Sequence, residues 1–198
     1  VDNTLGRTWI EMHPATALRD ACRYFVATDH RPERAPKDPR DLRVLDPACG
    51  SGHFLLYAFD LLATIYREAW EADWPTRHGA DRQTLRQAYP DRAALDRAVP
   101  ALIAERNLHG VDIDARAAQI AAFAIWLRAQ RAWVEADVTV SDRPRIRRTG
   151  IVVAEPMPGD AAMVDEFARS LRPPLLGKVF RTMVEAMRLA ADLGTLLK

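Results

Sequence analysis

The sequence has few cysteines and no long apolar run, and each shortage excludes a class of protein. Its 198 residues contain only two cysteines, Cys22 and Cys49, which is too few for the disulfide framework of a small secreted domain. No run of 18 apolar residues predicts a transmembrane helix, and the amino-terminal residues lack the pattern of a secretory signal. We therefore expect a reduced, cytoplasmic setting with no membrane contact.

The sequence also lacks an excess of charge. It has 28 basic and 27 acidic residues, so its net charge of +1 is no footprint of nucleic-acid binding. Lysine is scarce as well, because only Lys37, Lys178 and Lys198 are lysines and the remaining basic residues are arginine. One cluster is spaced to contact phosphates, although a solvated loop is the simpler interpretation: Arg143, Arg145, Arg147 and Arg148. The five histidines are scattered, so no metal site is predicted.

Residues 42 to 69 combine a short strand, a glycine turn and an amphipathic helix. Residues 42 to 45 form a short run, apolar except for Arg43, that is long enough for one buried parallel strand, which Asp46-Pro47 ends because proline cannot donate to a ladder. In Gly50-Ser51-Gly52 the missing Cβ atoms let a ligand approach the backbone. Apolar residues then recur at helical spacing, at Phe54, Ala58, Leu61, Leu62, Ile65 and Ala69. This order predicts a nucleotide-type cofactor cradle at the carboxyl end of a strand.

The string from Asp46 to Phe54, Asp-Pro-Ala-Cys-Gly-Ser-Gly-His-Phe, resembles motif I of the amino-methyltransferases, which bind S-adenosylmethionine. It is similar to the adenine-N6 DNA methyltransferases of type I and type IIG restriction systems, and most of all to the PglX-type methyltransferases of BREX phage-defence systems. Residues 3–9, 107–114 and 151–159 support this resemblance. The resemblance covers only part of such a protein. We therefore expect this chain to be the cofactor-binding segment of a site-specific DNA adenine-N6 methyltransferase from a bacterial restriction-modification or phage-defence system.

The glycine turn fits this cofactor better than a dinucleotide. Leu55 occupies the position of the third glycine of a dinucleotide fingerprint, and no lysine follows as in a P-loop. The resemblance implies that Asp46 holds the ammonium end of the cofactor, the alternative being a turn cap. The cofactor-binding residues it implies in this segment are Asp46, Pro47, Ala48, Cys49, Gly50, Ser51, Gly52 and Phe54.

A second acidic position follows a short apolar strand at residues 108–112. A carboxylate there binds ribose hydroxyls in doubly wound sheets, and the resemblance assigns Asp112 to the ribose and Ile113 to the adenine face. A capping or surface carboxylate is the alternative for Asp112, whereas Asp114 is expected to cap the next helix. The usual gap from the glycine turn is about 20 residues. The much longer gap here predicts an insertion.

A third acidic ligand is expected after the strand at 151–154, where the resemblance points to Glu155 and Asp160 is its rival. No catalytic residue is assigned. The Asn/Asp-Pro-Pro-Tyr/Phe motif of adenine-N6 methyltransferases is missing, since the only Pro-Pro pair lies in Arg172-Pro173-Pro174-Leu175. The chain begins at Val1, so we expect an excised, inactive segment of a longer enzyme whose partner is double-stranded DNA. Methyl transfer to RNA or to protein glutamine, or a non-catalytic scaffold role, are the alternatives.

The predicted fold is α/β, an incomplete Rossmann-like, doubly wound parallel sheet of the class I methyltransferase type. We expect one partial methyltransferase domain over 1–198, with an amino-terminal helical segment (1–41), motif I (42–70), a helical insertion (71–100) and the remaining elements (101–198). Helices are predicted over 15–28 and 101–106, over 115–133 with Ile120, Ala124 and Leu127 buried, and from about 160 and 177. The first strand would form an edge, which predicts cover by a helix, a terminal segment or self-association.

Overall fold

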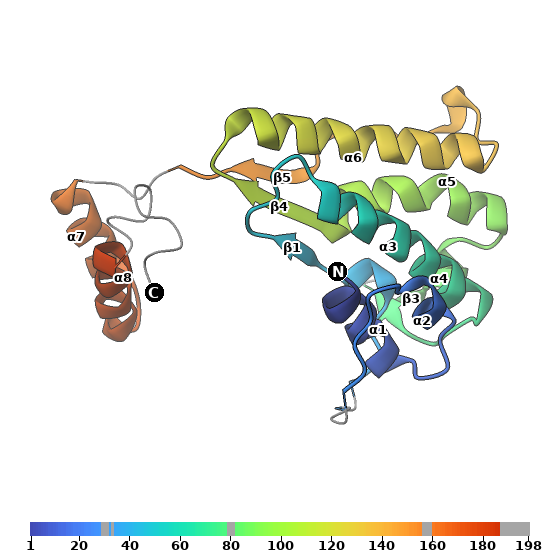
Figure 1. Ribbon diagram of the computed structural model, residues 1–198, viewed down its shortest axis with the longest axis horizontal. Helices are drawn as coiled ribbons and strands as arrows, with labels where there is room; N and C mark the ends of the chain where they lie inside the picture. Colours follow the sequence, from blue (N-terminus) through green and yellow to red (C-terminus); the bar gives the residue numbers. More distant parts are fainter. Residues whose placement is uncertain (29–31, 33, 79–81, 156–159, 187–198) are drawn as a thin grey trace. The chain divides into compact units, whose positions relative to one another are not determined.

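The computed structural model describes residues 1–28, 32, 34–78, 82–155 and 160–186 (Figure 1). The chain divides into two compact units, Val1–Val153 and Ala154–Lys198. The first unit contains η1 (Asp2–Gly6, a π-helical turn), α1 (Arg7–Met12), α2 (Leu18–Ala21), η2 (Pro39–Asp41, a 3-10 turn), β1 (Val44–Asp46), α3 (His53–Glu71), β2 (Arg77–His78), β3 (Gln83–Thr84), α4 (Leu85–Ala88), α5 (Arg92–Leu102), η3 (Ile103–Asn107, a π-helical turn), β4 (Leu108–Asp112), α6 (Ala115–Glu135), η4 (Val140–Asp142, a 3-10 turn) and β5 (Gly150–Val153). The second contains α7 (Ala161–Ser170) and α8 (Pro174–Ala186).

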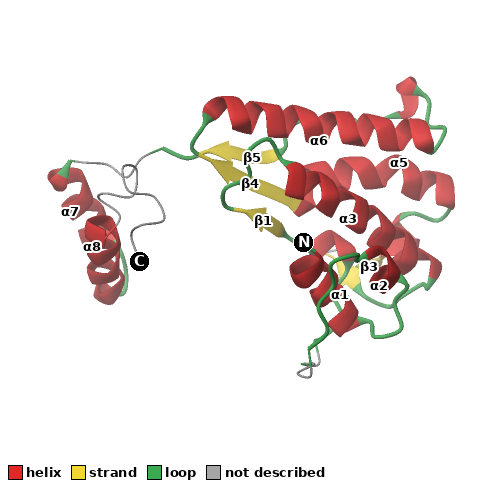
Figure 2. Cartoon of the chain, in the orientation of Figure 1, coloured by secondary structure: helices red, strands yellow, loops and turns green. Residues whose placement is uncertain are grey.

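The main sheet has three parallel strands in the order β1-β4-β5 (Figure 2). Asp46 pairs with Gly110, and Gly110 pairs with Ile151. All three predicted strands are therefore confirmed, as are their α/β class and parallel direction. The carboxyl ends of β1 and β4 meet at one edge, where the glycine turn follows β1 and Asp112 ends β4.

The connecting helices α3 and α6 pack against the strands and against each other. Two successive crossovers in the same direction across a parallel sheet place their helices on one face. Double winding would cover the other face too, but there Leu45 is 63% exposed and Val152 is also exposed. The described strands thus have helices on one face, and the predicted double winding stays a prediction. β1 pairs only with β4 among the described strands, so cover of its free edge stays a prediction.

Small residues bring α3 and α6 close to the sheet. A Cβ added to Gly52 would lie 3.1 Å from Cβ of Ala121, and one added to Gly110 would lie 2.9 Å from Leu55 Cδ1. The buried face of α6 is accordingly rich in alanine: Ala118, Ala121, Ile125, Ala129 and Trp133. The prediction that Ile120 and Leu127 are buried was wrong. Both are exposed, because the alanine face allows the closer helix contact.

The predicted helix over 15–28 was also wrong, because α2 ends at Ala21. Side chains of η1 hold the following segment in a non-helical course. Asp2 Oδ2 accepts from the Tyr24 N–H at 2.8 Å. The Asn3 amide donates to the Tyr24 carbonyl and accepts from the Val26 N–H, both at 2.8 Å. These long-range bonds compete with the helical pattern of the segment.

The insertion between β1 and β4 is more varied than predicted. It contains the antiparallel pair β2-β3 besides α4 and α5. Pro100 lies inside α5, which begins at Arg92, so the short helix predicted after Pro100 was wrong in its start. Asp91 caps α5 by accepting from the Ala94 N–H at 2.7 Å, which explains the earlier beginning.

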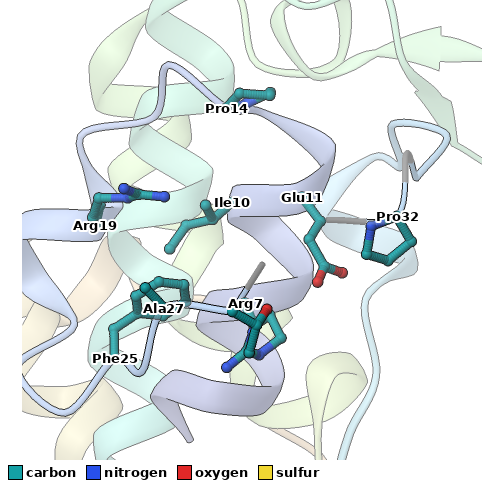
Figure 3. Close-up of a pocket in the computed structure, with 9 residues that line it drawn as sticks. Arg7, Ile10, Glu11, Pro14, Arg19, Phe25, Ala27 and Pro32 are labelled. Atoms are coloured by element: carbon teal, nitrogen blue, oxygen red, sulfur yellow. The ribbon is translucent and has the colours of Figure 1, made fainter. Parts of the chain in front are cut away.

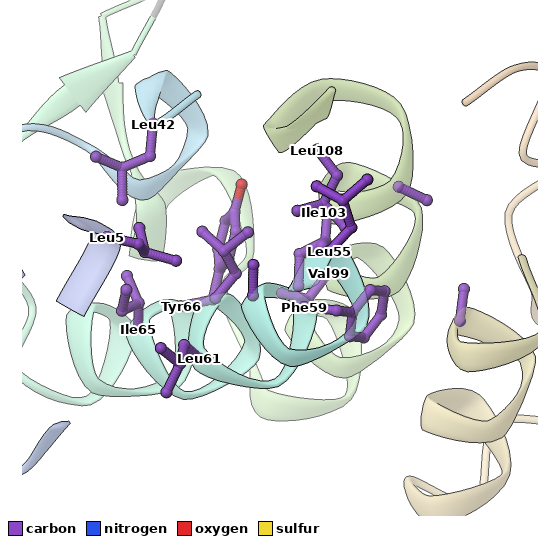
Figure 4. Packing of buried hydrophobic residues seen from close by; sticks show 14 of the residues in the cluster. Leu5, Leu42, Leu55, Phe59, Leu61, Ile65, Tyr66, Val99, Ile103 and Leu108 are labelled. Carbon is purple, nitrogen blue, oxygen red and sulfur yellow. The ribbon is translucent and has the colours of Figure 1, made fainter. Parts of the chain in front are cut away.

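The core gathers buried side chains of the amino-terminal helices, of α3, α5 and α6 and of the sheet, and Figure 4 shows part of it. Within it Asn107 is fully buried, and its side chain makes three hydrogen bonds. Its amide donates to the carbonyls of Pro39 and Leu42 at 2.9 and 2.8 Å, and its oxygen accepts from the Tyr66 hydroxyl at 3.0 Å. We call these the Asn107 contacts. They join the segment before β1 to the start of β4 and so fix how the two strands align.

In the second unit, α7 and α8 pack as a pair. Asp160 caps α7 by accepting from the N–H groups of Ala162 and Met163. A Cβ on Gly177 would lie 2.3 Å from the Ala168 carbonyl oxygen, so Gly177 allows α8 to approach α7. The two predicted helices are confirmed, although α8 begins at Pro174, before Gly177. The spacing of the sequence also predicts Met187 on the apolar face of the last helix, but this residue lies outside the described residues.

Within the described ranges, no helix combines the length and apolar character needed to cross a bilayer. Nor do histidine, cysteine and acidic side chains of the described part gather in a group of three or more that would hold a metal ion.

Candidate functional site

The turn between β1 and α3 has a backbone that glycine allows. Gly50 and Gly52 have φ angles of +52° and +89°, in the left-handed region. The Cys49 N–H donates to the Val111 carbonyl at 2.9 Å, and the Gly52 N–H donates to the Cys49 carbonyl at 2.8 Å. These bonds hold the turn against the end of β4. No described heavy atom lies within 4 Å of a Cβ built on Gly50, so one side of the turn is open.

Asp112 ends β4 and bonds to this turn. Its Oδ2 accepts from the Gly50 N–H at 2.7 Å, and its Oδ1 accepts from the Asp114 N–H at 2.9 Å. The N–H groups of Asp114 and Gly50 hold the pKa of the Asp112 carboxyl below its usual value, so the group is ionised near neutral pH. A carboxylate has about four acceptor sites. Asp112 therefore retains acceptor capacity for ligand hydroxyls.

Asp46 ends β1 at the same edge of the sheet. Its Oδ1 accepts from the Ala48 N–H at 3.2 Å. Its Oδ2 is buried and has no hydrogen-bond partner within the described part of the chain. An unsatisfied buried acceptor costs about 1–3 kcal/mol, which a ligand N–H would offset.

The amino terminus of α3 completes this edge. No described side chain caps it at Gly52, so its first N–H groups favour a negative group nearby. Ser51 Oγ and His53 Nδ1 lie 3.0 Å apart beside the turn. Two apolar side chains are exposed here, Phe54 at 68% and Ile113 at 63%. Of the apolar stripe predicted for this helix, Phe54 alone lies outside the buried face, and Leu55 takes its place there.

The edge thus combines an ionised carboxylate, an unsatisfied carboxylate oxygen, an uncapped helix terminus and exposed apolar groups. The family model of the MmeI DNA-methyltransferase domain matches residues 35–146, which include the turn, Asp112 and all of α6. The chain belongs to the MmeI-type DNA-methyltransferase domain family.

Two relatives of this MmeI-type domain are named adenine-specific methyltransferases. The chain is 33% identical over 141 residues to the adenine-specific methyltransferase BrxX of Escherichia coli O9:H4 (strain HS). It is 32% identical over 146 residues to the adenine-specific methyltransferase PglX of Lacticaseibacillus casei (strain Zhang). Each match covers 66% of this chain and 10% of the relative, so the chain spans about a tenth of the length of these proteins.

In this MmeI-type domain the residues predicted around the glycine turn lie close to those predicted at the end of β4. Asp46, the turn from Pro47 to Gly52, Phe54, Asp112 and Ile113 all lie at the carboxyl edge of β1 and β4. Cys49 is buried there, and burial raises the pKa of its thiol, which agrees with a packing role. Glu155 belongs to the second unit and is exposed, so its role as a ligand stays a prediction. Its rival Asp160 caps α7.

Sequence reasoning missed two features of this MmeI-type domain. The Asn107 contacts align β1 and β4, the strands that carry the site. From the sequence, Asn107 entered only as the first residue of the segment 107–114 and was given no role. A small cavity of about 200 Å³ also lies beside α1, lined by residues that include Ile10, Phe25 and Pro32 (Figure 3). Arg7 and Arg19 place their guanidinium groups 5.2 and 5.4 Å from the Phe25 ring centroid. The cavity shares no residue with the glycine turn. Its arginine-aromatic contacts hold the 22–28 segment against α1 and α2.

Proposed function

We propose that the chain is the S-adenosylmethionine-binding part of a DNA adenine-N6 methyltransferase. One observation carries the proposal: the 2.7 Å bond from the Gly50 N–H to Asp112 Oδ2. It joins the glycine turn to the carboxylate that ends the neighbouring strand. Ligands of open parallel sheets bind at this edge, outside the carboxyl ends of the strands.

The residues of this edge fit the parts of the cofactor. The unsatisfied Oδ2 of Asp46 suits the ammonium group, and the uncapped terminus of α3 suits the carboxylate. Asp112 suits the ribose hydroxyls because it is ionised and has free acceptor sites. Exposed Ile113 suits the adenine face. When bound, the cofactor supplies the methyl group, and these residues hold and orient it.

DNA as the substrate class rests on the family and on the names of the relatives. The chain itself contains no group assigned to the methyl acceptor. Its only Pro-Pro pair, at 173–174, precedes Leu175 and not an aromatic residue. We infer that the target adenine is held by residues elsewhere in the longer protein and that this chain alone transfers no methyl group.

Isothermal titration with S-adenosylmethionine tests the cofactor site. We expect binding by the wild-type chain and a dissociation constant about 10- to 100-fold higher for Asp112→Ala, since charge-assisted bonds are lost. Asp20→Ala, which removes an exposed carboxylate of α2, is the matched control and should bind like wild type. Equal affinity in all three proteins would remove Asp112 from the site.

Two further assays test the substrate. In the full-length protein, Asp112→Ala should abolish adenine methylation of duplex DNA, measured by sequencing that detects the modified base. The 198-residue chain alone should transfer no labelled methyl group to the same DNA. Methyl incorporation into RNA or protein, with none in DNA, would contradict the proposed substrate.

A further inference from the structure

Helix α3 begins with three backbone N–H groups that find no acceptor among the described residues. Its first helical bond runs from the Leu56 N–H to the Gly52 carbonyl at 2.9 Å. The preceding N–H groups, those of His53, Phe54 and Leu55, donate to no atom of the described part. Leu55 is only 1% exposed, so water has little access to its N–H. Free N–H groups at the start of a 19-residue helix favour an anion.

The side chains of the first turn of α3 do not supply this anion. Acidic residues are favoured in the first turn of a helix, because the helix dipole attracts negative charge there. The first turn of α3 has no acidic residue, and it begins with His53. A histidine at this position does not stabilise the helix, since positive charge is favoured at the opposite end. The composition of the turn therefore fits an external anion better than a helix cap.

The imidazole of His53 is held at one ring nitrogen and available at the other. Ser51 Oγ lies 3.0 Å from His53 Nδ1, beside the glycine turn. When the serine hydroxyl donates to Nδ1, the ring proton stays on Nε2, which remains a donor. Asp46 and Asp112 accept from backbone N–H groups, and neither bonds to His53 in the described structure. His53 is exposed, so a ligand can reach its ring.

We propose that His53 Nε2 donates to the carboxylate of S-adenosylmethionine, and that this contact selects the complete amino-acid tail of the cofactor. Ser51 holds the ring for it. The ammonium and carboxylate groups of the cofactor are carried by the same carbon atom, so their partners must lie side by side. Asp46, proposed to hold the ammonium group, and His53 lie at the two ends of the glycine turn. The inference rests on the proposed function and adds to it a residue that sets cofactor specificity.

Decarboxylated S-adenosylmethionine separates this contact from the rest of the site. The analogue keeps the adenine, the ribose and the ammonium group, and it lacks the carboxylate. Isothermal titration with both ligands therefore combines a missing ligand group with a missing side chain, as in a double-mutant cycle. We expect the wild-type chain to bind the cofactor at least about 10-fold more tightly than the analogue, because the analogue forms no charge-assisted bond there.

His53→Ala should lose this preference. We expect its dissociation constant for the cofactor to rise about 10-fold and that for the analogue to stay within about two-fold of wild type. His53→Gln keeps an amide donor near the position of Nε2 and should recover most of the affinity for the cofactor. Arg67→Ala is the matched control, because Arg67 is exposed on the same helix about 21 Å away. It should bind both ligands like wild type.

Two results would overturn the role of His53. One is an unchanged affinity of His53→Ala for the cofactor, and the other is an equal loss for both ligands, which a merely structural role would give. Asp112→Ala distinguishes these results from a failure of the proposed function, because it should weaken both ligands, which share the ribose. If the wild-type chain binds neither ligand, the proposed function and this inference fall together.

Discussion

At the scale of single residues, the two glycines of the turn differ in what surrounds them. Both have left-handed backbone angles, which cost a residue with a Cβ about 1–2 kcal/mol. Gly50 has open space beside it, whereas a Cβ on Gly52 would lie 3.1 Å from Ala121. The backbone alone therefore requires glycine at position 50, and both backbone and packing require it at position 52.

Gly50→Ala and Gly52→Ala separate these two effects. We expect Gly50→Ala to lower the free energy of unfolding by about 1–2 kcal/mol, from backbone strain alone. Gly52→Ala should lower it by about 1–3 kcal/mol more, because α6 must shift away from the turn. Urea denaturation of both variants measures the difference. Equal losses would show that the contact with Ala121 relaxes freely.

Asp112 is the residue whose charge is tied to the fold. Its pKa in the folded chain is lowered, so its contribution to stability is present above the unfolded pKa, near 3.9, and is lost as pH falls through the folded value. We expect the urea midpoint of the wild-type chain to fall below pH 4 more steeply than that of Asp112→Asn. Parallel pH profiles of the two proteins would contradict this assignment.

At the scale of elements, the Asn107 contacts hold the strands that carry the site. Tyr66 is fully buried, and burial raises the pKa of its hydroxyl above the usual range, so it remains a neutral donor to Asn107. Tyr66→Phe would leave the Asn107 oxygen buried without its donor. We expect a loss of about 1–3 kcal/mol in the free energy of unfolding, measured by urea denaturation. Tyr24→Phe, at a side chain that is 77% exposed, should change stability by less than about 0.5 kcal/mol.

The two faces of α6 offer a comparison with identical chemistry. Ile125 is fully buried, whereas Ile120 is 56% exposed on another face of the same helix. At a concentration where the chain is monomeric, Ile125→Ala should lower the free energy of unfolding by about 2–5 kcal/mol. Ile120→Ala should lower it by less than about 1 kcal/mol. Similar losses in both variants would mean that Ile120 is covered within the monomer.

At the scale of the whole molecule, ligand binding and folding are linked. A ligand that binds only the folded chain stabilises it by about 2.7 kcal/mol at a concentration of 100 times its dissociation constant. Saturating S-adenosylmethionine should therefore raise the melting temperature of the chain by several degrees, measured by differential scanning fluorimetry. The same concentration should leave Asp112→Ala nearly unchanged. A rise of equal size in that variant would place the binding elsewhere.

Local sequence patterns were enough to predict the order of the main elements and the position of the glycine turn. Alternating apolar runs and helical periods predicted β1, α3, β4, α6 and β5, because each pattern reflects one buried strand or one amphipathic helix. The string from Asp46 to Gly52 was informative because few residue types fit a turn that needs left-handed backbone angles and lets a ligand come close to the backbone. The resemblance to DNA methyltransferases that this string carries is confirmed, because the chain belongs to the MmeI-type DNA-methyltransferase domain family.

Long-range packing, which local patterns do not specify, sets which side of each helix is buried and where those patterns fail. Helix α6 has apolar residues on two faces, and periodicity cannot tell a face of small residues that packs closely from one of large residues that stays exposed. The 22–28 segment has a helical pattern, but side chains of Asp2 and Asn3 hold its backbone. In the same way Asn107 acquires its role from three partners distant in sequence. Contacts between distant residues outweigh local preference here because each one satisfies a polar group or fills a space that the local pattern does not specify.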